Sequence, residues 1–382
     1  MRRLILSLAL VSLPAWGAID DVLRSPHAFS EAPLAAGQTV RVPTVQVVMA
    51  DYDLIAHDFA AQARRAGESE QAWKTRVDAW LVAETGFILK AQTRQTEVNS
   101  PIATATETKE AYRPVGYRRA HVLPVQGGLV DAKGTGTAYP QQRHHGNGLA
   151  TLGEMIREFI FEKLVNEVMT DARANVRTVG SYAAMDFGFD VIHQDGSRDR
   201  AGYILRQAHV RASGNISTLG KEEAFQVEKI LRRYGLTSSG ETYGFRHAGQ
   251  PHHEWDYTNV QGTNNSRVIE IIDFGAYLAV DQFKHRLVSH TDIYTPLIEP
   301  GQPGFIQPDP SRRVSLEQWG NLGVADPKMD KAWIWSHELA RAWAEGRADR
   351  GAAEQHLRAL LEPFKNQRRS GGMCRSILIS TK

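Results

Sequence analysis

The stretch Arg267-Val268-Ile269-Glu270-Ile271-Ile272-Asp273-Phe274-Gly275 decides how this chain is interpreted. Val and Ile suit the pleated, half-buried surface of a sheet, so the run predicts a strand over 267–272. Such a strand would deliver Asp273 to the mouth of a cleft. Taken alone, the same letters are more often an ordinary strand end in which Gly275 forms a turn.

Length and composition bound the possible functions. The 382 residues allow one large domain or two lobes. Lys plus Arg number 45 and Asp plus Glu number 43, which gives a formal net charge of +2 at pH 7. This balance points neither to nucleic acid nor to an anionic membrane, so any anion site must be local. The single cysteine, Cys374, excludes an intrachain disulfide framework and a metal site built on thiolates.

The first 17 residues predict a secretory signal peptide, 1–17. A basic start, Met1-Arg2-Arg3, precedes an apolar run over 4–13, and Ala15-Trp16-Gly17 offers small residues for cleavage. The apolar run is too short for a permanent membrane helix, and no later stretch approaches the required length. We therefore expect an exported protein, periplasmic or secreted, without a stable membrane span. A buried first helix is the alternative.

Residues 18–110 predict an N-terminal extension that is partly helical. Residues 19–50 are mixed and interrupted by proline, and they give no firm assignment. Apolar residues at helical spacing predict helices over 52–65 and 72–82. The polar stretch 91–111 predicts a loop that leads to the next unit.

A hairpin is predicted over 121–133. Two short extended runs flank Gly127-Gly128, which is the pattern of paired strands around a turn. The second run ends at Lys133, and Gly134 and Gly136 follow at once.

The clearest helix is predicted over 149–169, where apolar residues form one wide face that must be buried. Glu158 lies at the edge of this face, and from there a carboxylate can reach into a cleft. A strand is predicted over 202–206, followed by a loop that carries Arg211.

The last part of the chain, 221–382, begins with an amphipathic helix predicted over 221–234. The pair Asn264-Asn265 and the strand quoted above come next. After a proline-rich connection, helical segments are predicted over 329–348 and 352–366.

Residues with chemical potential follow one another in a defined order. They are a hairpin lysine, a helix glutamate, two arginines, an asparagine pair and a strand-end aspartate, namely Lys133, Glu158, Arg206, Arg211, Asn264, Asn265 and Asp273. In protein kinases a lysine binds nucleotide phosphates, a glutamate fixes that lysine, and Asn and the Asp of Asp-Phe-Gly hold Mg²⁺. Arginine suits phosphate because it binds bidentately, and lysine acts as a point charge. The ordered set is far more specific than any one of its members.

Several longer segments carry a family resemblance. They are Ala132-Lys133-Gly134-Thr135-Gly136-Thr137-Ala138-Tyr139, Gly146-Asn147-Gly148-Leu149-Ala150, Ile156-Arg157-Glu158-Phe159, Arg206-Gln207-Ala208-His209-Val210-Arg211, Thr258-Asn259-Val260-Gln261-Gly262-Thr263-Asn264-Asn265 and Asp273-Phe274-Gly275. In this order they resemble the motifs of the selenoprotein O family of kinase-fold protein adenylyltransferases. The resemblance covers about 118–280 and is best over 133–160.

The resemblance implies an α+β fold of the two-lobed protein-kinase-like type behind the helical N-terminal extension. It implies an N-lobe-like nucleotide-binding region over 111–220 and a C-lobe-like region with the metal-binding Asp-Phe-Gly over 221–382. The implied activity is transfer of AMP from Mg-ATP to a Ser, Thr or Tyr hydroxyl of a protein substrate. No nucleic acid partner is implied.

The same resemblance implies roles for the nucleotide-binding residues. Lys133 would pair with the phosphates, in a loop that includes Gly134 and Gly136. Arg206 and Arg211 would hold the buried terminal phosphate.

The remaining roles concern catalysis and the metal. Glu158 would orient the lysine, and Asn265 and Asp273 would ligate Mg²⁺. Asn264 stands where the family has an aspartate proposed as the general base.

This chain departs from the family pattern at three of these positions. The amide of Asn264 cannot accept the hydroxyl proton, and a nearby acidic residue, Glu254 or Asp256, is an alternative base. Asn147 and Leu149 replace an aspartate and an arginine near the glycine turn. Three functions therefore stay open: a nucleotidyltransferase, a phosphotransferase that uses the same pocket, and a catalytically silent pseudokinase that binds a nucleotide or a partner.

Other catalytic patterns are less well supported. His144-His145 and His252-His253-Glu254 supply ligand types that zinc accepts, but the spacing His-Glu-x-x-His is absent from the sequence. Solvated loop histidines are the favoured interpretation. The sequence contains no Gly-x-Ser-x-Gly elbow, so a serine triad is not indicated.

Overall fold

A computed structural model describes the parts of the chain that hold the sheets and their helices. These are residues 34–89, 107–112, 119–136, 148–192, 198–209, 226–227, 229–231, 236–237, 261–265, 268–274, 278–279, 339–355, 357–358 and 361. Several predicted features lie outside these residues: the signal peptide, the two histidine segments, Glu254, Asp256, Arg211 and Cys374.

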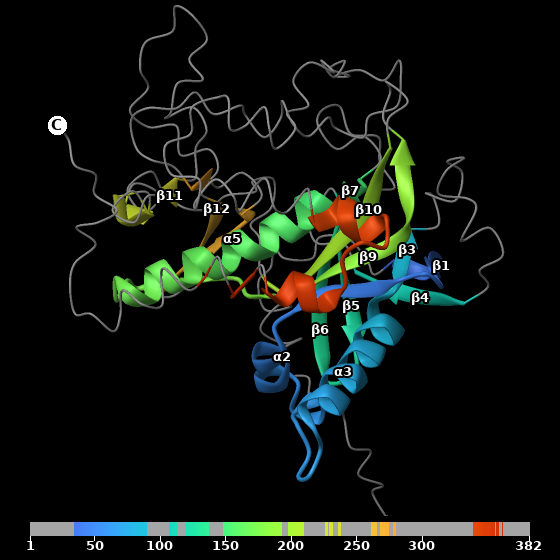
Figure 1. Cartoon of the computed structure of the whole chain (residues 1–382). Helices are drawn as coiled ribbons and strands as arrows, with labels where there is room; N and C mark the ends of the chain where they lie inside the picture. Colours follow the sequence, from blue (N-terminus) through green and yellow to red (C-terminus); the bar gives the residue numbers. More distant parts are fainter. Residues whose placement is uncertain are drawn as a thin grey trace, which may run out of the picture.

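The centre of the fold is a six-stranded antiparallel sheet (Figure 1). Its strands run in the order β2-β9-β10-β6-β5, and β7 pairs with β10. The strands are β2 (Gln46–Ala50), β5 (Ala120–Val125), β6 (Gly128–Lys133), β7 (Ala150–Thr151), β9 (Ser181–Ile192) and β10 (Arg198–Gln207). The pairing of β5 with β6 confirms the predicted hairpin.

Helices cover both faces of this sheet. They are α2 (Tyr52–Asp58), α3 (Glu70–Thr85) and α5 (Leu152–Asp171). On β10, Ile204 packs in the same core as α5, whereas Tyr203 and Leu205 pack in the core that contains α2 and α3. Successive side chains of a strand point to opposite faces. The sheet therefore lies between α5 on one side and the two N-terminal helices on the other.

Strand β2 belongs to the predicted N-terminal extension but completes the central sheet. It pairs with β9, so one sheet runs across the boundary predicted at residue 110. Val47, Val48 and Met49 are all buried in it, which fits an apolar run covered on both faces. Residues 19–50 received no assignment from the sequence because so short an apolar run does not distinguish the periodicity of a strand from that of a helix.

A second, three-stranded sheet lies beside the end of α3, where Arg41 and Lys109 donate to carbonyl oxygens of the helix. It has the order β3-β1-β4 and is antiparallel. Its strands are β1 (Leu34–Arg41), β3 (Phe87–Leu89) and β4 (Thr108–Ala111). The loop predicted over 91–111 thus ends in a strand.

The predicted helices have different bounds from those expected. The helix expected over 52–65 is α2 followed by a short 3₁₀ turn, η1 (Ala60–Gln62). The helix expected over 72–82 is longer, because Ser69 caps α3 by accepting a hydrogen bond from the amide of Ala72.

Helix α5 begins three residues later than the sequence predicts. Thr151 caps it and accepts a hydrogen bond from the amide of Glu154 at 3.2 Å, the Thr-x-x-Glu pattern of a capping box. The preceding residue, Ala150, joins Thr151 in β7. The cap therefore sets the start of the helix.

The strand predicted over 267–272 is confirmed as β13 (Val268–Ile272). It pairs antiparallel with β12 (Gln261–Asn265) and parallel with β8 (Val176–Thr178), the short strand that follows α5. Phe274, just beyond β13, is fully buried in the core around α5. A two-stranded ribbon, β11 (Leu236–Thr237) with β14 (Leu278–Ala279), completes the described strands.

The C-terminal part returns to the central sheet. Residues 339–344 are helical, within the predicted segment 329–348, and residues 350–355 are helical, beginning two residues before the predicted segment 352–366. Leu339 and Ala353 belong to the same core as α5, and these helices are drawn in red beside α5 and the sheet in Figure 1. The fold is thus mixed α and β with mainly antiparallel sheets. No helix in the described part of the chain has the length and apolar character needed to cross a membrane.

Candidate functional site

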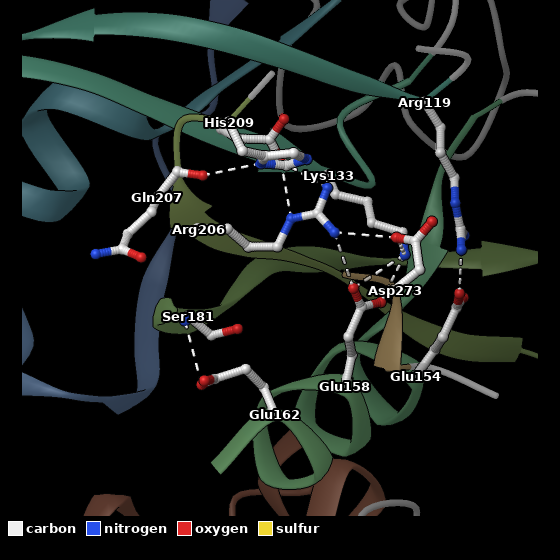
Figure 2. A network of polar contacts seen from close by, with 11 residues as sticks. Arg119, Lys133, Glu154, Glu158, Glu162, Ser181, Arg206, Gln207, His209 and Asp273 are labelled. Carbon is white, nitrogen blue, oxygen red and sulfur yellow. Dashed lines mark hydrogen bonds and ion pairs between the residues drawn. The ribbon is translucent and has the colours of Figure 1, made fainter. Parts of the chain in front are cut away.

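Lys133 lies at the end of β6, where its side chain is enclosed by two carboxylates (Figure 2). Its Nζ donates to Oε1 and Oε2 of Glu158 at 3.0 and 2.7 Å and to Oδ1 of Asp273 at 2.6 Å. The three residues come from β6, α5 and the end of β13. The structure thus brings together the lysine, the glutamate and the aspartate of the predicted set.

Successive side chains of β6 point to opposite faces of the sheet, and this alternation explains the direction of Lys133. Val130 and Ala132 pack in the core that contains α2 and α3. Asp131 and Lys133 therefore face the other side of the sheet, where α5 lies. Asp131 thus lies beside Lys133. The sequence interpretation did not include Asp131, although a spacing of two residues in a strand indicates that both side chains share one face.

Arg206 on β10 lies at the centre of the cluster. Its Nη1 donates to Glu158 Oε1 at 3.1 Å and to Asp273 Oδ1 at 3.0 Å. Its Nε and Nη2 donate to Asp131 Oδ1 at 2.8 and 2.7 Å. The residue is fully buried. In this state the predicted phosphate-binding arginine holds carboxylates, and a phosphate would have to exchange with one of them.

Glu158 belongs to a row of glutamates along α5. Glu154, Glu158 and Glu162 follow at intervals of four residues, which places them on one face of the helix. Glu158 and Glu162 are both buried, and each faces a different partner group in Figure 2. The regular spacing is the sequence signal that marks this face of α5 as polar.

Asp273 has an unusual backbone conformation. Its φ is 60°, in the left-handed region that non-glycine residues seldom adopt, although aspartate tolerates it better than most. Such residues gather at functional sites. The side chain of Asp273 is 17% exposed, while that of Glu158 is 0% exposed. Asp273 is thus the carboxylate of this cluster that solvent reaches.

Among the described side chains that these contacts join, carboxylates outnumber cations. Two cations, Lys133 and Arg206, face three carboxylates, those of Asp131, Glu158 and Asp273. With all five groups ionised the formal sum is 2 − 3 = −1. Asp273 is the partly exposed carboxylate among these three, so a cation from solvent can reach the cluster at its edge.

A second ion pair adjoins the cluster and was missed by the sequence interpretation. Nη2 of Arg119, just before β5, contacts Oε1 of Glu154. Burial lowers the pKa of Arg119, but the carboxylates of Glu154, Glu158 and Asp273 outweigh this effect and raise it above the ordinary value. Arg119 therefore lies within the field of the same carboxylates. Its only sequence signal is its place ahead of a strand.

The glycines after Lys133 shape the turn. Gly134 and Gly136 each have a φ of 98°. A side chain on Gly134 would approach Ala150 Cβ to 2.9 Å and Gly202 O to 3.0 Å, so only glycine fits there. The amides of Gly134 and Gly136 donate to Arg119 O and Gly148 O. In the structure the amides of these two predicted nucleotide-binding glycines serve the backbone of the turn.

Two further predicted residues lie on β12, and one is not placed. Asn264 and Asn265 pair in register with Ile269 and Val268, so both are on the strand next to β13. Their side chains, and Arg211 as a whole, lie outside the described residues.

Magnesium is the metal that the predicted residues imply. Within the described ranges no group of three or more His, Cys, Asp or Glu side chains is arranged to hold a metal ion. Mg²⁺, however, is usually bound through one or two carboxylates together with substrate phosphates and water, not in an all-protein cage. The partly exposed carboxylate of Asp273, in a cluster with excess negative charge, fits that mode.

Comparison of the chain with protein-family models and with curated proteins found no match to either. The site is therefore interpreted from its own geometry. Its defining feature is a buried lysine held by a helix glutamate and a strand-end aspartate, with one arginine shared between both carboxylates.

Proposed function

We propose that this protein is an exported nucleotidyltransferase of the selenoprotein O type. It would have a two-lobed protein-kinase-like fold and would transfer AMP from Mg-ATP to a hydroxyl of a Ser, Thr or Tyr residue of another protein. One observation carries the proposal: Lys133 on a strand forms an ion pair with Glu158 on the next long helix, and the Asp273 carboxylate lies at 2.6 Å from the same amino group. A strand lysine, a helix glutamate and a metal-binding aspartate are the parts that kinase-like phosphate sites share.

Each residue has a role that follows from its chemistry. Lys133 would bind the phosphates, and Glu158, fully buried, would hold its amino group in place. Arg206, with Arg211, would hold the terminal phosphate. When bound, Mg²⁺ would neutralise phosphate charge. Asp273 would hold the ion, together with Asn265.

Binding requires a change of partners. Lys133 and Arg206 both donate to Oδ1 of Asp273 in the structure. A phosphate that takes these donors must displace the carboxylate, and a divalent cation gives the displaced carboxylate a new partner. Glu158 keeps its contacts to Lys133 and Arg206 during this exchange, so the two cations stay in position.

At phosphorus the proposed reaction forms one bond and breaks one, and a proton moves from the hydroxyl to a base. The hydroxyl oxygen bonds to the α-phosphorus, the bond from that phosphorus to the bridging oxygen breaks, and pyrophosphate leaves. The hydroxyl proton passes to a carboxylate base, for which the sequence offers Glu254 or Asp256. Asn264 stands where the family has this base, and an amide cannot accept the proton.

This departure favours a second candidate function. A catalytically silent pseudokinase would keep the charged cluster and bind a nucleotide without transferring any group. Asn264 on β12 is the observation that favours it, since β12 lies directly beside β13.

Labelled ATP distinguishes these functions. The mature protein is incubated with Mg²⁺, candidate protein substrates and ATP labelled on either the α or the γ phosphate, with Asp273→Ala as the control. We expect protein-bound α label that Asp273→Ala abolishes. Bound γ label would instead identify a phosphotransferase, and nucleotide binding without transfer of either label would identify the silent protein.

A further inference from the structure

Asp131 and Arg206 form a cross-strand pair next to the proposed nucleotide site. They are direct partners in the antiparallel register of β6 and β10, so their side chains leave the sheet side by side on one face. Both residues are fully buried. Asp131 lies two residues before Lys133 on the same face of β6.

The contacts of Arg206 are divided between two sides of its guanidinium. Nε and Nη2 donate to one oxygen of Asp131, at 2.8 and 2.7 Å. Nη1 donates to Glu158 and Asp273, at 3.1 and 3.0 Å. A guanidinium is planar and presents its donors in a fixed fork. Fixing Nε and Nη2 therefore also fixes the direction of Nη1.

We propose that Asp131 is a positioning residue: it sets the orientation of the Arg206 guanidinium so that Nη1 is presented to the terminal phosphate of the bound nucleotide. The inference rests on the proposed function for the identity of the ligand. Asp131 touches neither the phosphate nor the metal, and it acts through Arg206.

The burial of the pair makes this role possible. Both side chains are shielded from solvent, since Arg206 is 1% and Asp131 0% exposed. A charge-assisted hydrogen bond in such a setting is stronger than at a surface. Asp273, at 17%, is more exposed than either. A ligand that displaces Asp273 thus meets an arginine whose other donors remain bound to Asp131.

The first test needs no nucleotide. The Nε–H signal of Arg206 is observed by NMR in protein with isotope-labelled arginine and is assigned by its loss in Arg206→Lys. We expect a slowly exchanging signal in the wild type and in Asp131→Asn, because the Asn oxygen accepts the same two bonds. Asp131→Ala should lose it. A signal that is unchanged in Asp131→Ala would overturn the proposal.

The second test measures affinity for Mg-ATP and Mg-ADP. We expect Asp131→Ala to weaken Mg-ATP binding about tenfold, as loss of a charge-assisted hydrogen bond implies, and Mg-ADP binding much less. Asp131→Asn should restore Mg-ATP affinity to within about threefold of the wild type. In an Arg206→Lys background Asp131→Ala should cause no further loss, since Lys lacks the fork. A merely structural role would lower the melting temperature and leave the ATP-to-ADP ratio unchanged.

The outcomes separate this inference from the proposed function. If the wild type binds Mg-ATP and Asp131→Ala binds it equally well, the role of Asp131 is refuted and the nucleotide site stands. An equal loss with and without Arg206 would also refute it. If the wild type binds no nucleotide, the proposed function fails, and with it the ligand that Asp131 is proposed to serve, whatever the NMR signal shows.

Discussion

Two lysines that are largely shielded from solvent, Lys133 on β6 and Lys163 on α5, have different surroundings. Lys133 contacts Glu158 and Asp273, and with Arg206 it belongs to a cluster of charged side chains from four elements. Lys163 contacts Asp51 at 2.6 Å and Glu162 at 2.9 Å. Both have two carboxylate partners, so a buried lysine with carboxylates is not in itself a mark of function.

The difference lies in what else the carboxylates hold. Asp51 caps α2 by accepting from the amide of Leu54 at 3.0 Å. Glu162 accepts from the amide of Ser181 and from the hydroxyl of Thr178, and Lys163 donates to the carbonyl of Ser181.

These backbone contacts join α2, α5 and β9, so we interpret the Lys163 cluster as structural. Burial lowers the pKa of Lys163, but Glu162 and Asp51 outweigh it and raise this pKa above its ordinary value. The ammonium therefore stays charged.

The Lys133 cluster has the features expected of a site. Asp273 adopts a left-handed backbone conformation at the end of a strand and is partly exposed. Functional sites often trade stability for such arrangements. The comparison thus predicts that matched changes in the two clusters will have different effects.

Replacing the partly exposed aspartate of each cluster, Asp51 or Asp273, by asparagine should give the largest difference between the clusters in the free energy of unfolding. Asp51→Asn keeps the helix cap but removes one of the two carboxylate charges that Lys163 contacts. We therefore expect a loss of about 1–3 kcal/mol in the free energy of unfolding. Asp273→Asn leaves Lys133 its contacts with Glu158 and leaves Arg206 its contacts with Glu158 and Asp131, and Asn tolerates a positive φ. Its free energy of unfolding should change by less than about 0.5 kcal/mol. Urea unfolding measures both, and equal losses would remove the distinction.

Removal of divalent cations should expose the competition between Asp273 and phosphate. In EDTA the wild type should bind ATP poorly, because Asp273 occupies Lys133 and Arg206. Asp273→Asn lacks that competing charge, so its metal-free affinity for ATP should be about threefold to tenfold higher than that of the wild type. Calorimetry in EDTA tests this. A lower metal-free affinity in Asp273→Asn would show that Asp273 does not compete with phosphate.

Asp58 contacts a strand neighbour of each cluster, and its replacement should have the smallest effect. Its Oδ2 accepts from Tyr182, next to Ser181, and from Gln207, next to Arg206.

Burial raises the pKa of Asp58, but hydrogen bonds from Gln207, His57 and Tyr182 outweigh it and hold the pKa below its ordinary value. A lowered pKa stabilises the fold above the unfolded value of about 4, and this contribution is lost as the pH falls through the folded pKa.

The stability difference between the wild type and Asp58→Asn should therefore shrink from pH 6 to pH 3, as urea midpoints would report. A constant difference would contradict this assignment.

Some parts of the site could be predicted from sequence because their signals are local. Lys133 ends a hairpin, Glu158 lies on a long helix, and Asp273 follows a β-branched strand. Each signal falls within a few residues. The meeting of these elements was expected only from the resemblance in motif order.

Other parts depend on pairing between distant segments. The register that sets Asp131 opposite Arg206 is fixed by β6 and β10, which lie far apart in the chain. The place of β2 in the central sheet depends likewise on β9. Local period and composition do not encode such partners. For the same reason the return of the C-terminal helices to the core of α5 was not foreseen.

The most direct test of the central proposal is calorimetric binding of Mg-ATP to Lys133→Met and Lys163→Met, with circular dichroism to verify that both variants are folded. If Lys133 binds phosphate and Lys163 only supports the fold, Lys163→Met should bind within about threefold of the wild type. Lys133→Met should bind at least about thirtyfold more weakly. Equal affinities in the two folded variants would contradict the assignment of Lys133 to a nucleotide site.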